Sequence, residues 1–209
     1  MIIGVIGFIG SGKGTVSEYL TKRHGFKHDS FASSLKDACS VIFDWPRNLL
    51  EGDTDESRAW REEIDIWWAD KLGIPNFSPR YALQLVGTDS LRNHFNPDIW
   101  FLTLTNRIRK SPDQSVVISD VRFPNEINFI KENKGILIQV VRGNNPNWLD
   151  IAERANMGDS GASQIMHLKY SHVHFSEWAW VGTDVDYVIE NNGSVEDLTA
   201  QVDKIIERQ

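Results

Sequence analysis

The chain has 209 residues, of which 41% are hydrophobic, and this suffices for one compact domain with a substantial core. Its formal net charge of −7 argues against a protein that coats polymeric nucleic acid, because duplex binding usually needs a broad basic face. A single cysteine cannot form an internal disulfide, and no apolar run approaches the ~20 residues that cross a bilayer, so the composition favours a cytoplasmic protein without membrane contact.

The first twenty residues carry the clearest motif. Residues 1–6 are apolar and branched, as in a buried parallel strand, and residues 15–22 have the spacing of a helix. The segment between them matches G-x-x-x-x-G-K-[ST], except that Gly14 replaces the hydroxyl residue and Thr15 follows it. The motif predicts a loop whose backbone N–H groups and Lys13 ammonium hold the phosphates of ATP, a reading that the strand, loop and helix context favours over a glycine turn that binds nothing. The predicted ATP-binding residues here are Gly7, Gly10, Ser11, Gly12, Lys13, Gly14 and Thr15.

The rest of the chain predicts alternating strands and helices. A short strand is expected at 27–31, and a helix at 33–43 with Leu35, Ala38, Val41 and Ile42 on its inner side. Further helices are expected at 56–71, 80–95, 100–110, 124–133 and 195–207, and further strands at 116–119, 135–141 and 187–190.

These elements predict an α/β P-loop fold in which a parallel sheet is flanked by helices. We expect a single domain, 1–209, whose core comprises about 1–43, 79–142 and 181–209. Residues 44–78 read as a helical insertion, and residues 143–180, which lack clear periodicity, as a lid. The tryptophans of the insertion could stack a nucleobase, but at helical spacing Trp60, Trp67 and Trp68 more often form core or a subunit contact.

Charged residues follow two of the predicted strands. Asp120 and Arg122 come after 116–119, and Arg142 comes after 135–141. Because the carboxyl ends of parallel strands line the ligand crevice, these side chains should lie near Lys13. Asp120, and Thr15 through water, suit a magnesium ion, whereas the guanidinium groups of Arg122 and Arg142 suit phosphate oxygens. Lys13, Asp120, Arg122 and Arg142 form the predicted catalytic set; the alternative is a structural ion pair at the sheet edge, which for Arg142 is equally well supported.

Arg80 and Gln84 are four residues apart and therefore share one face of a helix. The guanidinium could bind a phosphate, and the amide could pair with the edge of a base. Taken alone, this pair, like Lys36, is better explained as an exposed polar face.

Several blocks, in order, resemble the bacteriophage-type deoxynucleoside monophosphate kinases. They are Gly-Ser-Gly-Lys-Gly-Thr at 10–15, Phe31 to Asp37, Leu83 to Asp89 with Trp100 behind it, Val117 to Arg122, Val140 to Arg142, His174-Phe-Ser-Glu177 and the turn Asn191 to Ser194. The blocks span most of the chain, and their shared order is the specific part of the resemblance.

The resemblance implies an adenylate-kinase-like enzyme that uses ATP and Mg²⁺ to convert a deoxynucleoside 5′-monophosphate into its diphosphate for nucleotide biosynthesis. It implies roles in binding the acceptor for Lys36, Arg80, Gln84, Asp89 and Arg122, in ordering the lid for His174 and Glu177, and in binding ATP for Asn191. It implies action in the cytoplasm, that of the host if the chain is phage-encoded, and is compatible with a homodimer.

Two alternatives stay open. One is a kinase of the same fold that acts on another phosphorylated metabolite, such as phosphomevalonate. The other is a P-loop ATPase or regulatory nucleotide-binding protein with no small acceptor. Arg80, Gln84 and Arg122 favour transfer, because they furnish a second polar pocket that a bare ATPase would not need.

Overall fold

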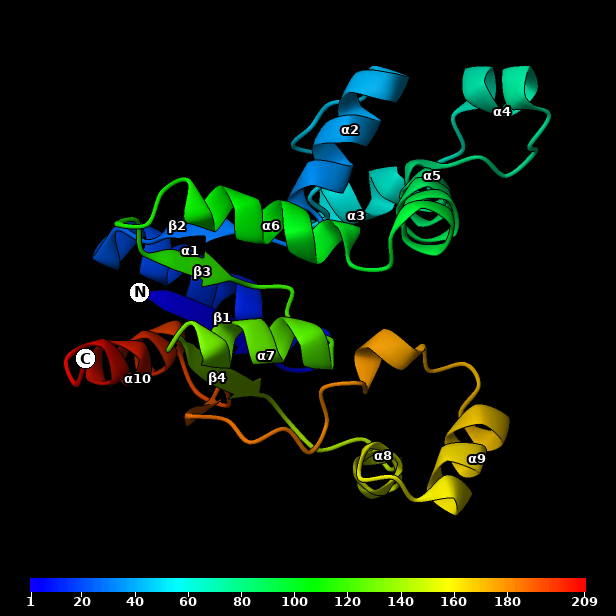
Figure 1. Cartoon of the computed structure of the whole chain (residues 1–209). Helices are drawn as coiled ribbons and strands as arrows, with labels where there is room; N and C mark the ends of the chain where they lie inside the picture. The colour runs from blue at the N-terminus through cyan, green and yellow to red at the C-terminus, as the bar shows by residue number, and fades with distance from the viewer. The chain divides into compact units, whose positions relative to one another are not determined.

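The computed structural model describes residues 1–209, which divide into two compact units (Figure 1). The first unit comprises residues 1–30 and 111–209, and the second comprises residues 31–110. The second unit thus joins the expected insertion, 44–78, with helices before and after it. The expected division into core, insertion and lid stays a prediction.

The first unit is built on one five-stranded sheet. Its strands are β1 (Ile2–Ile6), β2 (Lys27–Asp29), β3 (Val116–Ile118), β4 (Ile136–Val141) and β5 (Tyr187–Glu190). Their order is β2-β3-β1-β4-β5, and every neighbouring pair is parallel. In the centre, Ile3 of β1 is in register with Val117 on one side and Ile136 on the other. The predicted parallel α/β fold is therefore confirmed.

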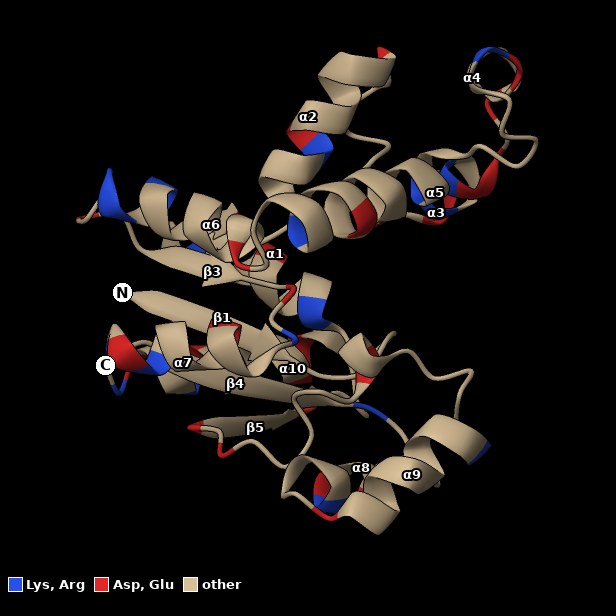
Figure 2. Cartoon of the chain, turned by 45° about the vertical axis from the view of Figure 1, so that its right-hand side comes forward, with Lys and Arg blue, Asp and Glu red and all other residues tan.

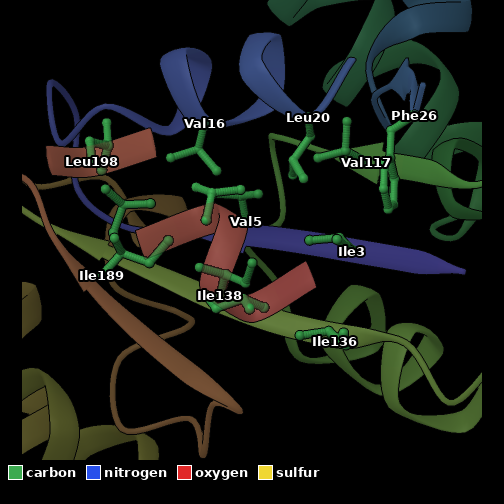
Figure 3. Close-up of a cluster of buried hydrophobic side chains, with 13 residues drawn as sticks. Ile3, Val5, Val16, Leu20, Phe26, Val117, Ile136, Ile138, Ile189 and Leu198 are labelled. Atoms are coloured by element: carbon green, nitrogen blue, oxygen red, sulfur yellow. The ribbon is translucent and has the colours of Figure 1, made fainter. Parts of the chain in front are cut away.

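Helices cover both faces of this sheet. Those that pack on the strands are α1 (Lys13–His24), α7 (Pro124–Glu132) and α10 (Val195–Ile206). The other helical elements of the unit are α8 (Leu149–Asn156), α9 (Ser160–Lys169) and the 3₁₀ turn η2 (Phe175–Glu177). On one face, Val16 and Leu20 of α1 point toward Ile3 and Val5 of β1 (Figure 3). Burial of β1 on both faces explains why it reads as a continuous apolar run.

The opposite face of the sheet receives α7. A Cβ on Gly4 of β1 would lie 2.2 Å from the Cδ1 of Ile130 on α7, so this helix packs directly onto the strand backbone. Alternate residues of β1 thus serve two separate cores, as the period of a strand requires. The unit is a three-layer α/β/α structure.

The segment 143–180 is more regular than its sequence indicates. It forms α8 and α9, which pack against each other, and then the turn η2. Asp159 caps α9 by accepting the N–H of Ala162 at 3.0 Å, and it also pairs with Arg154. Asn156 then holds the returning chain through the carbonyls of Trp178 and Val181, at 2.8 and 2.9 Å. Each helix is too short for its apolar period to be clear.

The second unit is entirely helical. Its elements are α2 (Ser33–Phe43), α3 (Asp55–Glu62), α4 (Ile66–Leu72), α5 (Pro79–Gln84), the π-helical stretch η1 (Leu85–Phe95) and α6 (Ile99–Arg109). The helix expected at 80–95 is present as α5 continued by η1. The helix expected at 56–71 is wrong as a single element, because Glu63 is extended and Asp65 caps a new helix by accepting the N–H of Trp68.

The expected inner face of α2 is also partly wrong. Val41 and Ile42 are 84% and 55% exposed, whereas Leu35 and Cys39, four residues apart, are buried. The inner stripe follows the 35/39 spacing because Leu35 lies against Gly87, and Phe43, four residues after Cys39, stacks on Trp45 at 4.5 Å between ring centroids. Cys39 is a core residue, as expected, and burial raises the pKa of its thiol to about 11, which leaves it inert as a nucleophile.

A cluster of aromatic side chains forms the core of the second unit. Trp45 and Phe77 are buried, Trp60 meets Trp45 edge-on at 6.1 Å, and the Nε1 of Trp68 donates to the carbonyl of Phe43 at 3.2 Å. Trp60 and Trp68 are therefore structural, as the sequence favours. Trp67 is 60% exposed and meets the ring of Trp68 at 4.7 Å between centroids. None of the helices in the chain has the length and hydropathy needed to span a bilayer.

Candidate functional site

The loop between β1 and α1 has the geometry that binds anions. Gly7, Gly10 and Gly12 have φ of 145°, 78° and 107°, and glycine alone adopts such values without strain. Gly12 is the N-cap of α1, where no side chain caps the helix and no acidic residue occupies the first turn. The first N–H groups of α1 therefore present positive charge that no side chain of their own neutralises.

Lys13, the first residue of α1, lies over this loop. Its Nζ donates to the carbonyl oxygens of Gly7 and Phe8, both at 2.8 Å. Burial, and next the charge of Arg122, lower the pKa of this ammonium to about 8, although the charge of Glu177 opposes the shift. The protonated lysine is therefore destabilised by burial and by a neighbouring cation, and a bound anion would stabilise it.

Two further predicted residues reach the loop. The side chain of Asn191, which follows β5, donates from Nδ2 to the carbonyl of Ser11 at 2.8 Å, and its backbone N–H donates to Val141. Arg142, which follows β4, approaches the carbonyl of Gly10 at 3.5 Å. The Ser11 hydroxyl is buried and has no hydrogen-bond partner within the chain.

An aromatic contact that the sequence does not reveal supports the same loop. Phe8 meets the rings of Trp148 and Trp180 at centroid distances of 5.4 and 4.9 Å. These tryptophans stand at the beginning and end of the segment expected to form the lid. The loop and the lid segment are therefore joined through one phenylalanine.

Arg122, the second cation near Lys13, is held by the His174–Glu177 motif. Its Nη1 donates to Glu177 at 2.7 Å and approaches the Ser176 hydroxyl at 3.3 Å. Ser176 is itself fixed by His174, whose Nδ1 lies 2.8 Å from the hydroxyl. The motif thus supplies a carboxylate partner for Arg122, and the charges of Arg122 and Glu177 both act on Lys13.

The backbone around Arg122 is fixed by a residue that sequence reasoning missed. Glu126, which is 4% exposed, accepts the N–H groups of Arg122 and Phe123 through Oε2, at 2.7 and 3.0 Å. The sequence does indicate this residue, because Pro124 begins α7 and Glu126 follows in the first turn, as at a typical helix start. Glu126 thus positions Arg122 by fixing its backbone, and not by contact with its guanidinium.

Asp120 and Thr15 are half-buried oxygen donors at the carboxyl end of β3 and in the first turn of α1. The chain has no group of three or more histidines, cysteines or carboxylates that could form a metal cage. One carboxylate and one hydroxyl suit Mg²⁺, which usually keeps waters and takes phosphate oxygens as further ligands. The residues present fit that ion.

The remaining predicted residues lie in the second unit. The Nζ of Lys36 on α2 donates to Glu51 at 2.5 Å, and Arg80 on α5 pairs with Glu62. Gln84 and Asp89 are exposed, on α5 and on η1. Trp100 lies behind η1 as expected, because its Nε1 donates to the carbonyl of Gly87 at 2.9 Å.

Comparisons with known proteins identify viral relatives. No family model matches the chain. A protein of Acanthamoeba polyphaga mimivirus with the provisional name deoxynucleotide monophosphate kinase is 39% identical over 153 residues, which cover 68% of this chain and 74% of that protein. The deoxynucleoside-5′-monophosphate kinase of Escherichia phage T5 is 41% identical over 147 residues, 61% of this chain and 58% of that protein, so less than two thirds of the phage protein is matched.

Dephospho-CoA kinases are also similar. The one from Fusobacterium nucleatum is 27% identical over 214 residues, covering 99% of this chain and 97% of that protein. Among solved structures, a dephospho-CoA kinase from Campylobacter jejuni is 20% identical with a TM-score of 0.47, covering 99% of this chain and 96% of that one.

Proposed function

The chain belongs to the deoxynucleotide monophosphate kinase family, and on that premise we propose that it transfers the γ-phosphoryl group of ATP to the 5′-phosphate of a deoxynucleoside monophosphate. The products are ADP and the deoxynucleoside diphosphate. The observation that supports this most is the loop before α1, where a lysine ammonium and an uncapped helix N-terminus converge.

The reaction needs no general base. A nucleotide 5′-phosphate is already largely ionised at neutral pH, since its second pKa is about 6. The difficulty is to bring two polyanions together in line while excluding water. Lys13, the loop amides, Arg122 and Arg142 are the groups that supply positive charge to the transferring phosphoryl group.

Arg122 would change partner during the reaction. It is held by Glu177 in this structure, and phosphate oxygens offer its guanidinium the same two-pronged geometry. His174 and Glu177 would thus keep Arg122 in position until a nucleotide binds. We propose that segment 143–180, anchored to the loop by Phe8, restricts the access of water.

Asp120 and Thr15 are the residues that would hold Mg²⁺. When bound, the ion neutralises charge on the β- and γ-phosphates of ATP. Lys36, Arg80, Gln84 and Asp89 are the proposed acceptor residues of the second unit. We propose that the reaction takes place in the cytoplasm.

A panel of acceptors tests the reaction. The chain is incubated with ATP and Mg²⁺ together with each common ribo- or deoxyribonucleoside monophosphate, dephospho-CoA or phosphomevalonate, and the products are separated. We expect a diphosphate to appear in step with ADP for one or more deoxynucleoside monophosphates. ADP formation that no acceptor stimulates would indicate an ATPase, and a product from dephospho-CoA or phosphomevalonate alone would assign the chain to another kinase activity.

The binding of ATP should weaken above pH 8. Lys13 attracts phosphate only when protonated, and its pKa without nucleotide is about 8. Bound polyanionic phosphate raises that pKa, so between the two values the affinity falls by about tenfold for each pH unit. Equilibrium titration of ATP from pH 7 to 9.5 measures the slope. A Lys13→Met variant serves as the control, and an equal slope in that variant would rule out Lys13 as the titrating group.

A further inference from the structure

Arg61, on α3, is a half-buried cation without a partner for its buried Nε. Its guanidinium lies against the backbone of Gly52, where a Cβ would come within 2.0 Å of Cζ and 2.1 Å of Nη2. Gly52 also has φ of 67°, a value that favours glycine. The absence of a side chain at Gly52 therefore leaves room for the Arg61 guanidinium, whose Nε has no hydrogen-bond acceptor there.

The charges around Arg61 do not compensate it. Burial lowers the pKa of its guanidinium, and the neighbouring Arg80 lowers it further. Arg58 acts in the same direction, and Glu62 and Glu51 act in the other. A half-buried guanidinium that neighbouring cations repel is costly to keep in a fold.

Both neighbouring carboxylates already have partners. Glu62 accepts from the Nε of Arg80. Glu51 accepts from Lys36 through one oxygen and from Arg47 through the other. Among these charged side chains, Arg61 is therefore a positive charge without a carboxylate of its own.

The position of Arg61 suggests what it binds. Helix α3 packs against α5, which carries Arg80, and basic and acidic bands adjoin each other on these two helices (Figure 2). On its other side, Arg61 covers Gly52, which follows the Glu51 that holds Lys36. Arg61 thus lies near Arg80, one of the cations proposed to bind the acceptor, and against the residue that follows the carboxylate partner of Lys36.

We propose that Arg61, together with Arg80, binds the 5′-phosphate of the acceptor nucleotide, an inference that rests on the proposed function. The planar fork of the Arg61 guanidinium can bind two oxygens of a phosphate dianion, and the carboxylates next to it already hold other cations. The anion also compensates the surplus charge. Arg61 is kept for binding at a cost in stability, as residues of functional sites often are.

The test compares Arg61→Gln with Arg58→Gln in the full chain. Arg58 lies on the same helix but is exposed and paired with Asp55, so it is a matched control. For Arg61→Gln we expect the KM of the deoxynucleoside monophosphate to rise by about tenfold to a hundredfold, the loss expected for charge-assisted hydrogen bonds, while the KM of ATP changes less than about twofold. The control should change neither constant.

Two further readouts separate binding from a structural role. The affinity for the deoxynucleoside, which lacks the phosphate, should be the same in wild type and Arg61→Gln, whereas the affinity for the monophosphate falls. The melting temperature of Arg61→Gln should equal or exceed that of wild type, because the variant removes an uncompensated charge. Arg61→Lys, which keeps the charge but not the fork, should give an intermediate KM.

Three results would overturn the inference. They are an unchanged KM for the monophosphate in Arg61→Gln, an equal loss of affinity for the nucleoside and the nucleotide, and a fall in melting temperature without a change in binding. If Arg61→Gln does not fold, a wild-type KM in Arg61→Lys contradicts the inference instead. A wild-type chain that phosphorylates no nucleoside monophosphate refutes the proposed function itself. If the wild-type chain is active and the Arg61 variants have the same KM for the monophosphate, only the assignment of Arg61 is refuted.

Discussion

Replacing Lys13 by methionine should lower kcat by about 10³-fold or more, because the transition state loses a preorganised cation next to the transferring phosphoryl group. Methionine keeps much of the length of the side chain but neither its charge nor its two hydrogen bonds to the carbonyls of Gly7 and Phe8. Both carbonyls belong to a half-exposed part of the loop, so water can replace the ammonium. The fold should therefore survive.

The measurement is the steady-state rate with ATP and saturating deoxynucleoside monophosphate, together with the melting temperature of each variant. Lys22→Met is the matched control, because Lys22 lies on the same helix and makes only an exposed pair with Glu18. It should retain wild-type turnover. If Lys13→Met kept more than about a tenth of the wild-type rate, Lys13 would not serve the chemical step.

Local patterns were sufficient to predict the sheet and the loop. The strands at 2–6, 116–118 and 136–141 are buried on both faces, so their apolar composition indicates their structure without knowledge of their neighbours. The loop needs glycines at fixed positions before a helix, and these follow one another in the chain. Such features depend on adjacent residues alone.

Features that depend on distant partners were harder to predict. Phe8 meets Trp148 and Trp180 across most of the sequence, and no local pattern indicates that contact. Arg61 stands in a charged stretch that reads as a solvated helix face. Its isolation is visible only once Gly52 and the pairing of Glu51 and Glu62 are known.

The error at α2 has the same origin. Helical periodicity allows several inner faces for 33–43, and the sequence offers Val41 and Ile42 as apolar candidates. The chain instead packs Trp45 and Phe77 near Phe43, at 4.5 and 5.4 Å between ring centroids, which sets the buried side of the helix. Tertiary packing decided between faces that periodicity left nearly equivalent.

Gly7→Ala should destabilise the protein by about 3 kcal/mol or more and weaken the binding of ATP. The added Cβ would lie 2.4 Å from the backbone oxygen of Val140 and 2.8 Å from the Ser11 hydroxyl. Val140 belongs to β4, which pairs with β1 along the centre of the sheet, so its carbonyl cannot move without disturbing the strand pairing. The φ of 145° at Gly7 adds backbone strain for any L-residue with a Cβ.

Thermal unfolding measures the expected loss, which corresponds to a fall in melting temperature of roughly 10 °C for a chain of this size. Gly14→Ala is the matched control for stability, because no atom lies within 4 Å of its added Cβ and alanine is the better helix former at the start of α1. It should melt at or above the wild-type temperature. Equal melting temperatures for Gly7→Ala and Gly14→Ala would mean that the loop can move away from β4, and that close packing against Val140 does not fix its shape.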